Sequence, residues 1–454
     1  MRLGNALSTD LYQLTMAAGY FHHGLHEKRI SMELFVRRLP PERRFLLVAG
    51  LENVVEHLRN LHFDEVQIEY LHRVPALRGA LSFELVEFLR DFRFRGDLWA
   101  MPEGTVAFDR EPLVRVTGTL LEAQLVETAL LSIYNTETLV ASKAARVVLA
   151  AEDTVCLEFG TRRTSPDEAI ASARAAFLAG FAATSNVEAG YRYDIPLAGT
   201  AAHAWVMAHE HEIDAFRHYV EVFPEHSIML VDTYDTLGGV RRAIEAAGSK
   251  LRGIRLDSGD LLSLSQQARA LLDEAGLTET TIVGSGDLDE HRIAKLRAAG
   301  APIDAWGVGT ALVRSGDVPS LGGVYKLVED HDTGRKVAKF SDAKSTLPGI
   351  HQVFRVSKQG RFQRDVIGTT PEFHVDAQPL LEEWMREGKL VRELPSLTSI
   401  RRRAREQLAA LPESVKSLDP IPSGEPAPYP VRTSDALDEL TEVVRRQAME
   451  EGSA

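Results

Sequence analysis

The chain has 454 residues, 44% of them hydrophobic, which is enough for one barrel-sized domain and a second folded unit. Its formal net charge of -13 argues against nucleic acid as a main partner, because phosphate backbones are bound by basic surfaces. A single cysteine, Cys156, excludes an internal disulfide, and no apolar run approaches the roughly 18 residues that a membrane helix needs. We therefore expect a globular, cytoplasmic enzyme without a membrane segment.

Residues 1–135 mix helical and strand-like segments, in contrast to the middle of the chain. The segment "STDLYQLTMAAGYFHHG" has a helical pattern, whereas "ISMELFVRRL" and "PLVRVTG" are strand-like. We interpret residues 1–135 as the N-terminal part of a second domain, separate from the region that follows.

Residues 136–345 repeat a regular unit, which consists of a short apolar strand, a turn rich in Gly, Asp or Ser, and an amphipathic helix. Strand starts near 227, 251, 281 and 303 are separated by about 22 to 30 residues, the length of a βα unit in a parallel sheet. The last two turns are rich in glycine. This favours a (β/α) barrel over an open doubly wound sheet, because such barrels bind phosphate after their final strands.

Residues 346–454 contain the strand-like segments "HQVFRVS" and "FQRDVIG", so we expect them to complete the second domain. The run "RRRAR" at 401–405 is typical of a solvated helix face. Residues 412–430 are rich in proline and are predicted to be a linker or wrapping segment. An exposed helix is predicted from Ser434 to Glu450.

The segment "GTAAHAWVMAHEHE" contains three histidines and raises the question of a metal site. A helical zinc pair needs histidines four residues apart, but Met207 lies four residues after His203 and four before His211. The pattern around His209 is HEH, which also does not fit. The sequence therefore predicts no metal site here and leaves His203, at a loop-to-helix junction, as the candidate functional histidine.

Two glycine-rich turns follow successive predicted strands. They are "GSGD", with Gly284 and Ser285, and "GVGT", with Gly307, Gly309 and Thr310. Glycines let backbone N–H groups approach an anion, and the N-terminus of a following helix favours negative charge. We interpret both turns as phosphate cradles, with simple tight turns as the alternative.

Charged side chains end two other strands. The segment "EFGTRR" ends with Arg162 and Arg163, and in "IRLDSGD" Arg255 and Asp257 alternate, so they leave the strand on the same side. An arginine suits a carboxylate or phosphate, and an aspartate suits a sugar hydroxyl or a metal. A structural ion pair between Arg255 and Asp257 is the alternative.

Seven segments together resemble those of the nicotinate phosphoribosyltransferase family. They lie in family order over Thr9–Thr310 and read "TDLYQLTMAAGYF", "EFGTRR", "ATSNVEAG", "GTAAHAW", "RLDSGDL", "GSGDLDE" and "GVGT". The resemblance implies an α/β fold, namely the irregular (β/α) barrel of type II phosphoribosyltransferases with a second α/β sandwich domain. It also implies a homodimer that makes nicotinate mononucleotide from nicotinate and 5-phosphoribosyl-1-pyrophosphate in NAD salvage, with Mg²⁺ and with ATP as co-substrate.

The resemblance implies a role for each matching residue. His203 would be phosphorylated by ATP, and Arg255 would bind the nicotinate carboxylate with Thr200 nearby. Phe159 and Tyr12 would stack on the pyridine ring, with Tyr12 supplied by the partner subunit, so that the active sites are shared. The phosphoribosyl groups would be held by a larger set, consisting of Arg162, Asp257, Gly284, Ser285, Gly307, Gly309 and Thr310.

Ser185 in "TSN" bears on the choice of substrate. The related family that uses nicotinamide has an aspartate at this position, and a carboxylate there would repel nicotinate. Nicotinamide phosphoribosyltransferase activity and a non-catalytic phosphometabolite-binding barrel stay open as alternatives. Quinolinate phosphoribosyltransferase is a further alternative, but its decarboxylating site needs more cations and no phosphorylated histidine.

Overall fold

The structure is a computed structural model that describes residues 3–341, 344–422 and 424–451. The chain forms two compact units, one made of Met1–Leu139 with Ser320–Ala454 and the other of Val140–Pro319. The long helix α6 (Glu127–Ala151) contributes to both units. The predicted domain ranges also include a few residues that lie outside the described ones, namely 1–2, 342–343 and 452–454. The same holds for residue 423 in the predicted proline-rich segment.

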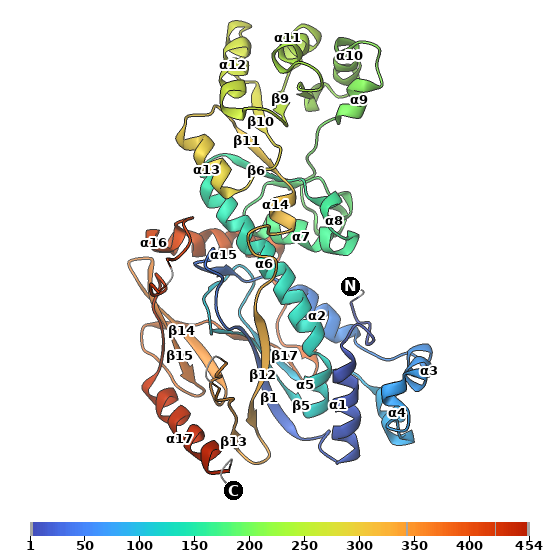
Figure 1. The fold of residues 1–454 in the computed structure, drawn as a ribbon, viewed down its shortest axis with the longest axis vertical. Coiled ribbons are helices and arrows are strands. Elements are labelled where there is room, and N and C mark those ends of the chain that lie inside the picture. The colour runs from blue at the N-terminus through green and yellow to red at the C-terminus, as the bar shows by residue number, and fades with distance from the viewer. Residues whose placement is uncertain (1–2, 342–343, 423, 452–454) are drawn as a thin grey trace. The chain divides into compact units, whose positions relative to one another are not determined.

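The unit Val140–Pro319 is built on a six-stranded parallel sheet with the order β7-β6-β11-β10-β9-β8 (Figure 1). Its strands are β6 (Val155–Glu158), β7 (Ala183–Thr184), β8 (Ile228–Leu230), β9 (Gly253–Leu256), β10 (Thr281–Gly284) and β11 (Ala305–Val308). Among the strands that the structure describes, the edge strands β7 and β8 do not pair with each other, so the barrel is irregular. All six strands point the same way, so their carboxyl ends lie along one edge of the sheet.

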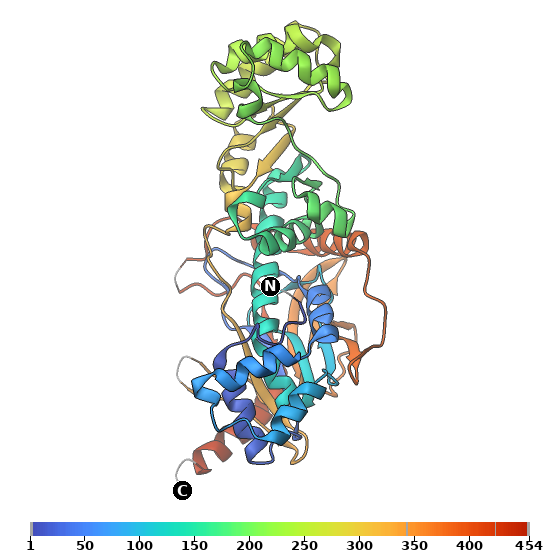
Figure 2. The same ribbon diagram turned by 90° about the vertical axis from the view of Figure 1, so that its right-hand side faces the viewer.

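Helices connect these strands, as the repeating sequence pattern predicts. They are α7 (Pro166–Ala179), α8 (Val187–Tyr193), α9 (His203–Met207), α10 (Glu212–Val222), α11 (Thr236–Ala247), α12 (Leu261–Glu274), α13 (Glu290–Ala298) and α14 (Thr310–Val313). The helices α10, α11 and α12 pack side by side (Figure 2). The central strand β11 is buried at all four positions, as is typical of a parallel sheet.

The other unit contains a seven-stranded antiparallel sheet with the order β13-β12-β1-β5-β3-β17-β18. Its strands are β1 (Arg29–Val36), β3 (Asp97–Ala100), β5 (Pro112–Thr119), β12 (Gly323–Asp330), β13 (Arg335–Lys336), β17 (Glu382–Arg386) and β18 (Lys389–Leu390). A second sheet has the order β16-β14-β15-β19 and comprises β14 (His351–Lys358), β15 (Arg361–Thr369), β16 (Ala377–Pro379) and β19 (Val431–Thr433). The short strands β2 (Leu46–Leu47) and β4 (Val106–Ala107) pair separately.

Residues from both ends of the chain meet in this unit. The helix α5 (Leu120–Leu125) contacts β1 and β5, while His351 of β14 hydrogen-bonds Glu33 of β1 at 2.6 Å between Nδ1 and Oε2. Packing on both sides explains why seven of the eight positions of β1 are buried. The remaining helices are α1 (Leu11–His22), α2 (Leu51–Asn60), α3 (Glu65–Arg73), α4 (Phe83–Asp91), α15 (Leu397–Ala410), α16 (Glu413–Lys416) and α17 (Asp435–Glu451).

Several elements differ in detail from the sequence predictions. The predicted barrel range, 136–345, includes β12, but this strand pairs with β1 in the other unit. The run at 401–405 lies on α15, where Arg402 and Arg405 are exposed while Arg403 donates to the Glu103 carbonyl at 2.9 Å. The predicted linker contains the short helix α16. No helix within the described ranges is both long and apolar enough to cross a membrane.

Candidate active site

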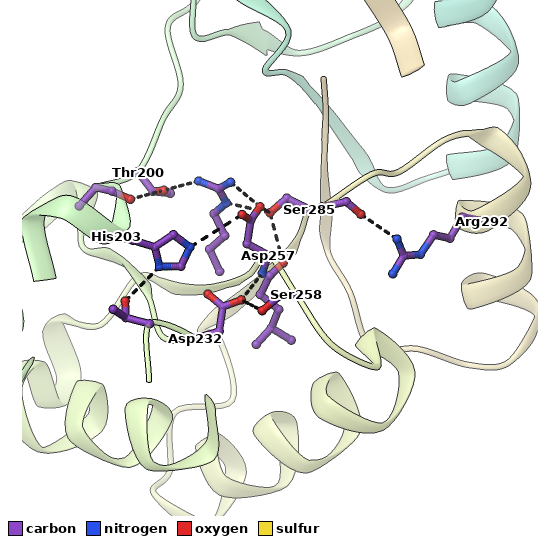
Figure 3. Close-up of polar contacts among 12 residues, drawn as sticks. Thr200, His203, Asp232, Asp257, Ser258, Ser285 and Arg292 are labelled. Carbon is purple, nitrogen blue, oxygen red and sulfur yellow. Dashed lines mark hydrogen bonds and ion pairs between the residues drawn. The ribbon is translucent and has the colours of Figure 1, made fainter. Parts of the chain in front are cut away.

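Polar side chains that follow three neighbouring strands gather at the carboxyl edge of the parallel sheet (Figure 3). Asp232 follows β8, Arg255 lies on β9 with Asp257 directly after it, and Ser285 follows β10. Because the side chains of a strand alternate, Arg255 and Asp257 leave β9 on the same side, as the sequence predicts. Thr200 joins them from the loop before α9.

Arg255 is held at three of its nitrogens. Nε donates to Oγ of Ser285 at 2.8 Å, Nη1 donates to Oγ1 of Thr200 at 3.0 Å, and Nη2 contacts Oδ1 of Asp257 at 2.6 Å. The Cζ atom lies 5.4 Å from the ring centroid of Phe159, a residue that follows β6. The guanidinium is therefore oriented beside an aromatic ring, an arrangement that suits a flat, anionic ligand.

Asp257 stays ionised through its neighbours. Burial by itself would raise its pKa, but a hydrogen bond from Ser285 and the charge of Arg255 outweigh burial and lower the pKa below its ordinary value. The Ser285 hydroxyl lies 2.6 Å from Oδ1 of Asp257, and the backbone N–H of Asp257 donates to Oδ2 of Asp232 at 3.0 Å. The site thus brings two carboxylates together, and Asp232 also accepts a hydrogen bond from Ser258 at 2.6 Å.

His203 is the first residue of α9 and its side chain is 41% exposed. Nδ1 lies 3.1 Å from Oγ1 of Thr233, and Nε2 lies 3.9 Å from Oδ2 of Asp257 (Figure 3). The structure therefore places this histidine beside the arginine–aspartate cluster. His209, by contrast, contacts the Trp205 carbonyl at 2.8 Å, and His211 is the exposed N-cap of α10.

The glycines of the two turns lie in close contact with neighbouring backbone or aromatic groups. Gly284 is the last residue of β10. Gly286 has φ +89°, and a Cβ added to it would lie 2.0 Å from the backbone carbonyl oxygen of Asp257. A Cβ on Gly307 would lie 2.6 Å from the Phe159 ring, so this glycine leaves room for that ring. Gly309 is the N-cap of the short helix α14, which begins at the exposed Thr310.

The other predicted residues are more dispersed. Arg162 lies in the short helix Thr161–Arg163 and is exposed, with no hydrogen bond or ion pair to any described residue. Ser185 is exposed after β7, and its backbone N–H donates to the Glu158 carbonyl at 2.9 Å. Tyr12 belongs to the other unit, where it is 47% exposed on α1.

Three residues at this edge were missed by sequence reasoning. Asp232 in "LVDTYDT" stands just after a predicted strand, as Asp257 does, and this shared position was an available signal. Gly286 lies within the "GSGD" turn, but nothing local distinguishes it from Gly284. Glu158 is a buried carboxylate whose pKa is raised by burial, although hydrogen bonds from the Thr184 hydroxyl and a backbone N–H oppose that effect.

Comparisons with known proteins cover almost the whole chain. Family models match the nicotinate phosphoribosyltransferase N-terminal domain at residues 7–135, the family at 154–330 and the C-terminal domain at 351–441. The chain is 44% identical to a nicotinate phosphoribosyltransferase of Mycobacterium tuberculosis, over 95% of this chain and 92% of the relative. It is 42% identical to that of Bacillus subtilis, over 95% and 93% of the two chains.

Solved structures agree with these sequence relatives. The crystal structure of human nicotinic acid phosphoribosyltransferase is similar with a TM-score of 0.85 at 30% identity, over 96% of this chain and 99% of the human one. A nicotinate-nucleotide pyrophosphorylase from Pyrococcus furiosus is similar with a TM-score of 0.74 at 25% identity, over 89% and 95%. The resemblance and the barrel fold predicted from the sequence are confirmed. The chain belongs to the nicotinate phosphoribosyltransferase family.

Proposed function

We propose that this chain synthesises nicotinate mononucleotide from nicotinate and 5-phosphoribosyl-1-pyrophosphate in NAD biosynthesis. The observation that carries the proposal is the guanidinium of Arg255, oriented by Ser285, Thr200 and Asp257 beside the ring of Phe159. A guanidinium matches a carboxylate, and an aromatic ring matches the face of a pyridine. The family membership supports the same reaction.

The reaction asks little covalent chemistry of the protein. The pyridine nitrogen attacks ribose carbon one with its free lone pair, and the bond to the pyrophosphate oxygen breaks with the electrons leaving on pyrophosphate. No general base is needed, so the protein acts by orientation and charge stabilisation. We assign the nicotinate carboxylate to Arg255 and Thr200, and the ring to Phe159. Phosphoribosyl binding is assigned to Arg162, Asp257, Gly284, Ser285, Gly307, Gly309 and Thr310.

Two carboxylates suit a Mg²⁺ ion that accompanies the pyrophosphate. Asp232 and Asp257 lie at one edge of the sheet, and Oδ1 of Asp232 is buried without a hydrogen-bond partner among the described residues. Mg²⁺ takes one or two protein carboxylates and completes its shell with phosphate and water oxygens, so this donor set fits. When bound, Mg²⁺ would neutralise charge on the departing pyrophosphate.

We further propose that His203 accepts the γ-phosphoryl group of ATP. A neutral imidazole nitrogen attacks the γ-phosphorus, the bond to the bridging oxygen breaks, and ADP leaves; water later hydrolyses the phosphohistidine. The exposure of the side chain and its place beside Asp257 support this role. Coupling to ATP would then adjust the affinity for the substrates and the equilibrium of nucleotide synthesis, without changing the chemistry at ribose carbon one.

His203→Ala tests the coupling separately from nucleotide synthesis. The variant should form no acid-labile phosphoprotein from ATP labelled at the γ-phosphate and should lose nicotinate-stimulated ATP hydrolysis, yet keep slow synthesis without ATP. His211→Ala is the matched control, because His211 is an exposed histidine of the same segment. Undiminished ATP hydrolysis in His203→Ala would reject the phosphohistidine.

A single substrate comparison tests the reaction itself. Purified protein is given 5-phosphoribosyl-1-pyrophosphate, Mg²⁺ and equal amounts of nicotinate, nicotinamide or quinolinate, and the nucleotides are separated by chromatography. We expect nicotinate mononucleotide as the main product. A preference for nicotinamide would identify an amide-specific enzyme, and binding of the phosphoribosyl substrate without any product would favour a non-catalytic barrel.

We place the reaction in the cytoplasm, where Cys156 stays reduced.

We also propose a homodimer in which each active site takes Tyr12 from the partner subunit. The proposal is supported by the exposed Tyr12 and its exposed neighbour Leu11, which present an aromatic and apolar surface on α1. A two-fold dimer would then contain two shared sites.

Mixing two inactive variants tests the shared site. Tyr12→Ala and Arg255→Ala chains should form mixed dimers in which one site collects both intact residues and the other collects both defects. With random exchange, mixed dimers are about half of the population, so activity should recover to roughly a quarter of wild type. If no activity returns although mass measurement confirms subunit exchange, both residues act within one chain.

A further inference from the structure

Arg292 connects the turn after β10 to the helix α13 (Figure 3). It lies in the first turn of α13, and its Nη1 donates to the backbone oxygen of Gly286 at 2.8 Å. Its own backbone N–H donates to Oδ1 of Asp289, the N-cap of the helix, at 2.8 Å. One residue therefore joins the turn and the helix N-terminus through two hydrogen bonds.

The helix α13 is itself fixed by buried charges. Glu290, at its first position, is fully buried and forms ion pairs with Nζ of Lys143 at 2.6 Å and with Nε of Arg146 at 2.8 Å. Lys143 also contacts Oδ1 of Asp317 at 2.9 Å. Because breaking a buried pair leaves an uncompensated charge, this network resists displacement. The helix thus gives Arg292 a rigid base.

One residue of the turn, Asp287, has an unfavourable backbone conformation. Gly286 and Asp287 both have left-handed φ values, +89° and +48°, and Asp287 lacks the freedom of glycine. The preceding residue, Ser285, lies between Arg255 and Asp257, with its Oγ 2.8 Å from Nε of the former and 2.6 Å from Oδ1 of the latter. The backbone N–H of Ser285 donates to the Leu256 carbonyl at 2.8 Å, which ties this residue to β9. A relaxation of the turn at Gly286 would therefore act on the orientation of the Ser285 hydroxyl.

We propose that Arg292 is a positioning residue for the active site. By holding the Gly286 carbonyl it keeps Ser285 between Arg255 and Asp257, and so it sets the orientation of both charged groups. Arg292 acts through the turn rather than on the substrates. The kinetic consequence rests on the proposed function, whereas the structural consequence does not.

Kinetics of Arg292 variants test the first consequence. Arg292→Ala should lower kcat/KM for nicotinate and for 5-phosphoribosyl-1-pyrophosphate by a similar factor, roughly tenfold, because one charge-assisted hydrogen bond is lost. Arg292→Lys keeps a cationic donor and should recover part of the loss. Lys295→Ala is the matched control, since Lys295 is exposed on the same helix and its side chain forms no hydrogen bond or ion pair with the described residues. It should behave as wild type.

The Ser285→Ala background separates positioning from direct binding of phosphate. If Arg292 acts through Ser285, Arg292→Ala should have little further effect once Ser285 is removed. A loss that persists in full in that background, or that is confined to the KM for 5-phosphoribosyl-1-pyrophosphate, would make Arg292 a direct anion ligand and overturn the proposal.

Hydrogen exchange tests the structural consequence without any activity. The amides of residues 285–287 should exchange faster in Arg292→Ala than in wild type or Lys295→Ala, because the turn loses its link to α13. Unchanged exchange would overturn the positioning role. If the wild-type protein makes no nicotinate mononucleotide, the proposed function fails, while faster exchange in Arg292→Ala would still support the link between the helix and the turn.

Discussion

The contact between Gly286 and the backbone of Asp257 makes Gly286→Ala a sharp test of the site geometry. A left-handed backbone costs a residue other than glycine roughly 1–2 kcal/mol. In addition, the new Cβ would lie 2.0 Å from the backbone carbonyl oxygen of Asp257. Because this oxygen belongs to the backbone, no side-chain rotation relieves the collision. Either Asp257 or the turn must therefore move, and both belong to the charged cluster.

Gly300→Ala provides a control with the same backbone strain but no collision. Gly300 has φ +72°, and nothing lies within 4 Å of an added Cβ. This variant should lower Tm by about 2–4 °C for each kcal/mol of strain and leave activity unchanged. Gly286→Ala should lower Tm further and reduce kcat/KM for nicotinate by about 100-fold, the cost of misplacing positioned groups by about 1 Å.

Thermal unfolding and initial rates with labelled nicotinate, measured in parallel for both variants, check these expectations. If Gly286→Ala and Gly300→Ala lose the same Tm and keep the same kcat/KM, the requirement for glycine comes from the backbone conformation alone. The contact with Asp257 would then have no bearing on the site.

Three further predictions concern charge. Asp257→Asn should lower the free energy of unfolding at neutral pH, because the lowered pKa of Asp257 means that its ionised form stabilises the fold. Urea unfolding should show the difference between variant and wild type shrinking as the pH falls below about 4, where the carboxylate is protonated. A difference that persists in acid contradicts this. Ser185→Asp should weaken nicotinate use in steady-state assays and admit some nicotinamide, so unchanged nicotinate kinetics would remove Ser185 from the site. Glu290→Gln should lower the free energy of unfolding by about 3–5 kcal/mol, because it breaks a buried ion pair. Glu225→Gln, which breaks the exposed ion pair with Arg252, should cost less than about 1 kcal/mol. Equal losses in urea unfolding would show that burial does not decide the strength of these pairs.

Much of the architecture could be predicted because it is encoded locally. The spacing of apolar strands and glycine turns is a property of consecutive residues, so the βα units from residue 154 onward were predicted correctly. Arg255 and Asp257 are separated by one residue in a strand, which by itself puts both side chains on one face. The loop-to-helix junction before His203 is likewise a local signal, and the structure starts α9 at that residue.

Other features required the tertiary structure, because they depend on partners far apart in the chain. The strand β12 follows the barrel in sequence but pairs with β1, nearly three hundred residues earlier, and no local pattern states which sheet a strand will join. Gly286 is distinguished from Gly284 by its left-handed φ and by the backbone of Asp257, which the fold brings against it. The same holds for Asp232, whose carboxylate becomes part of the site because β8 and β9 are neighbours in the sheet. Sequence determined which residues could carry the chemistry, and strand pairing decided which of them meet.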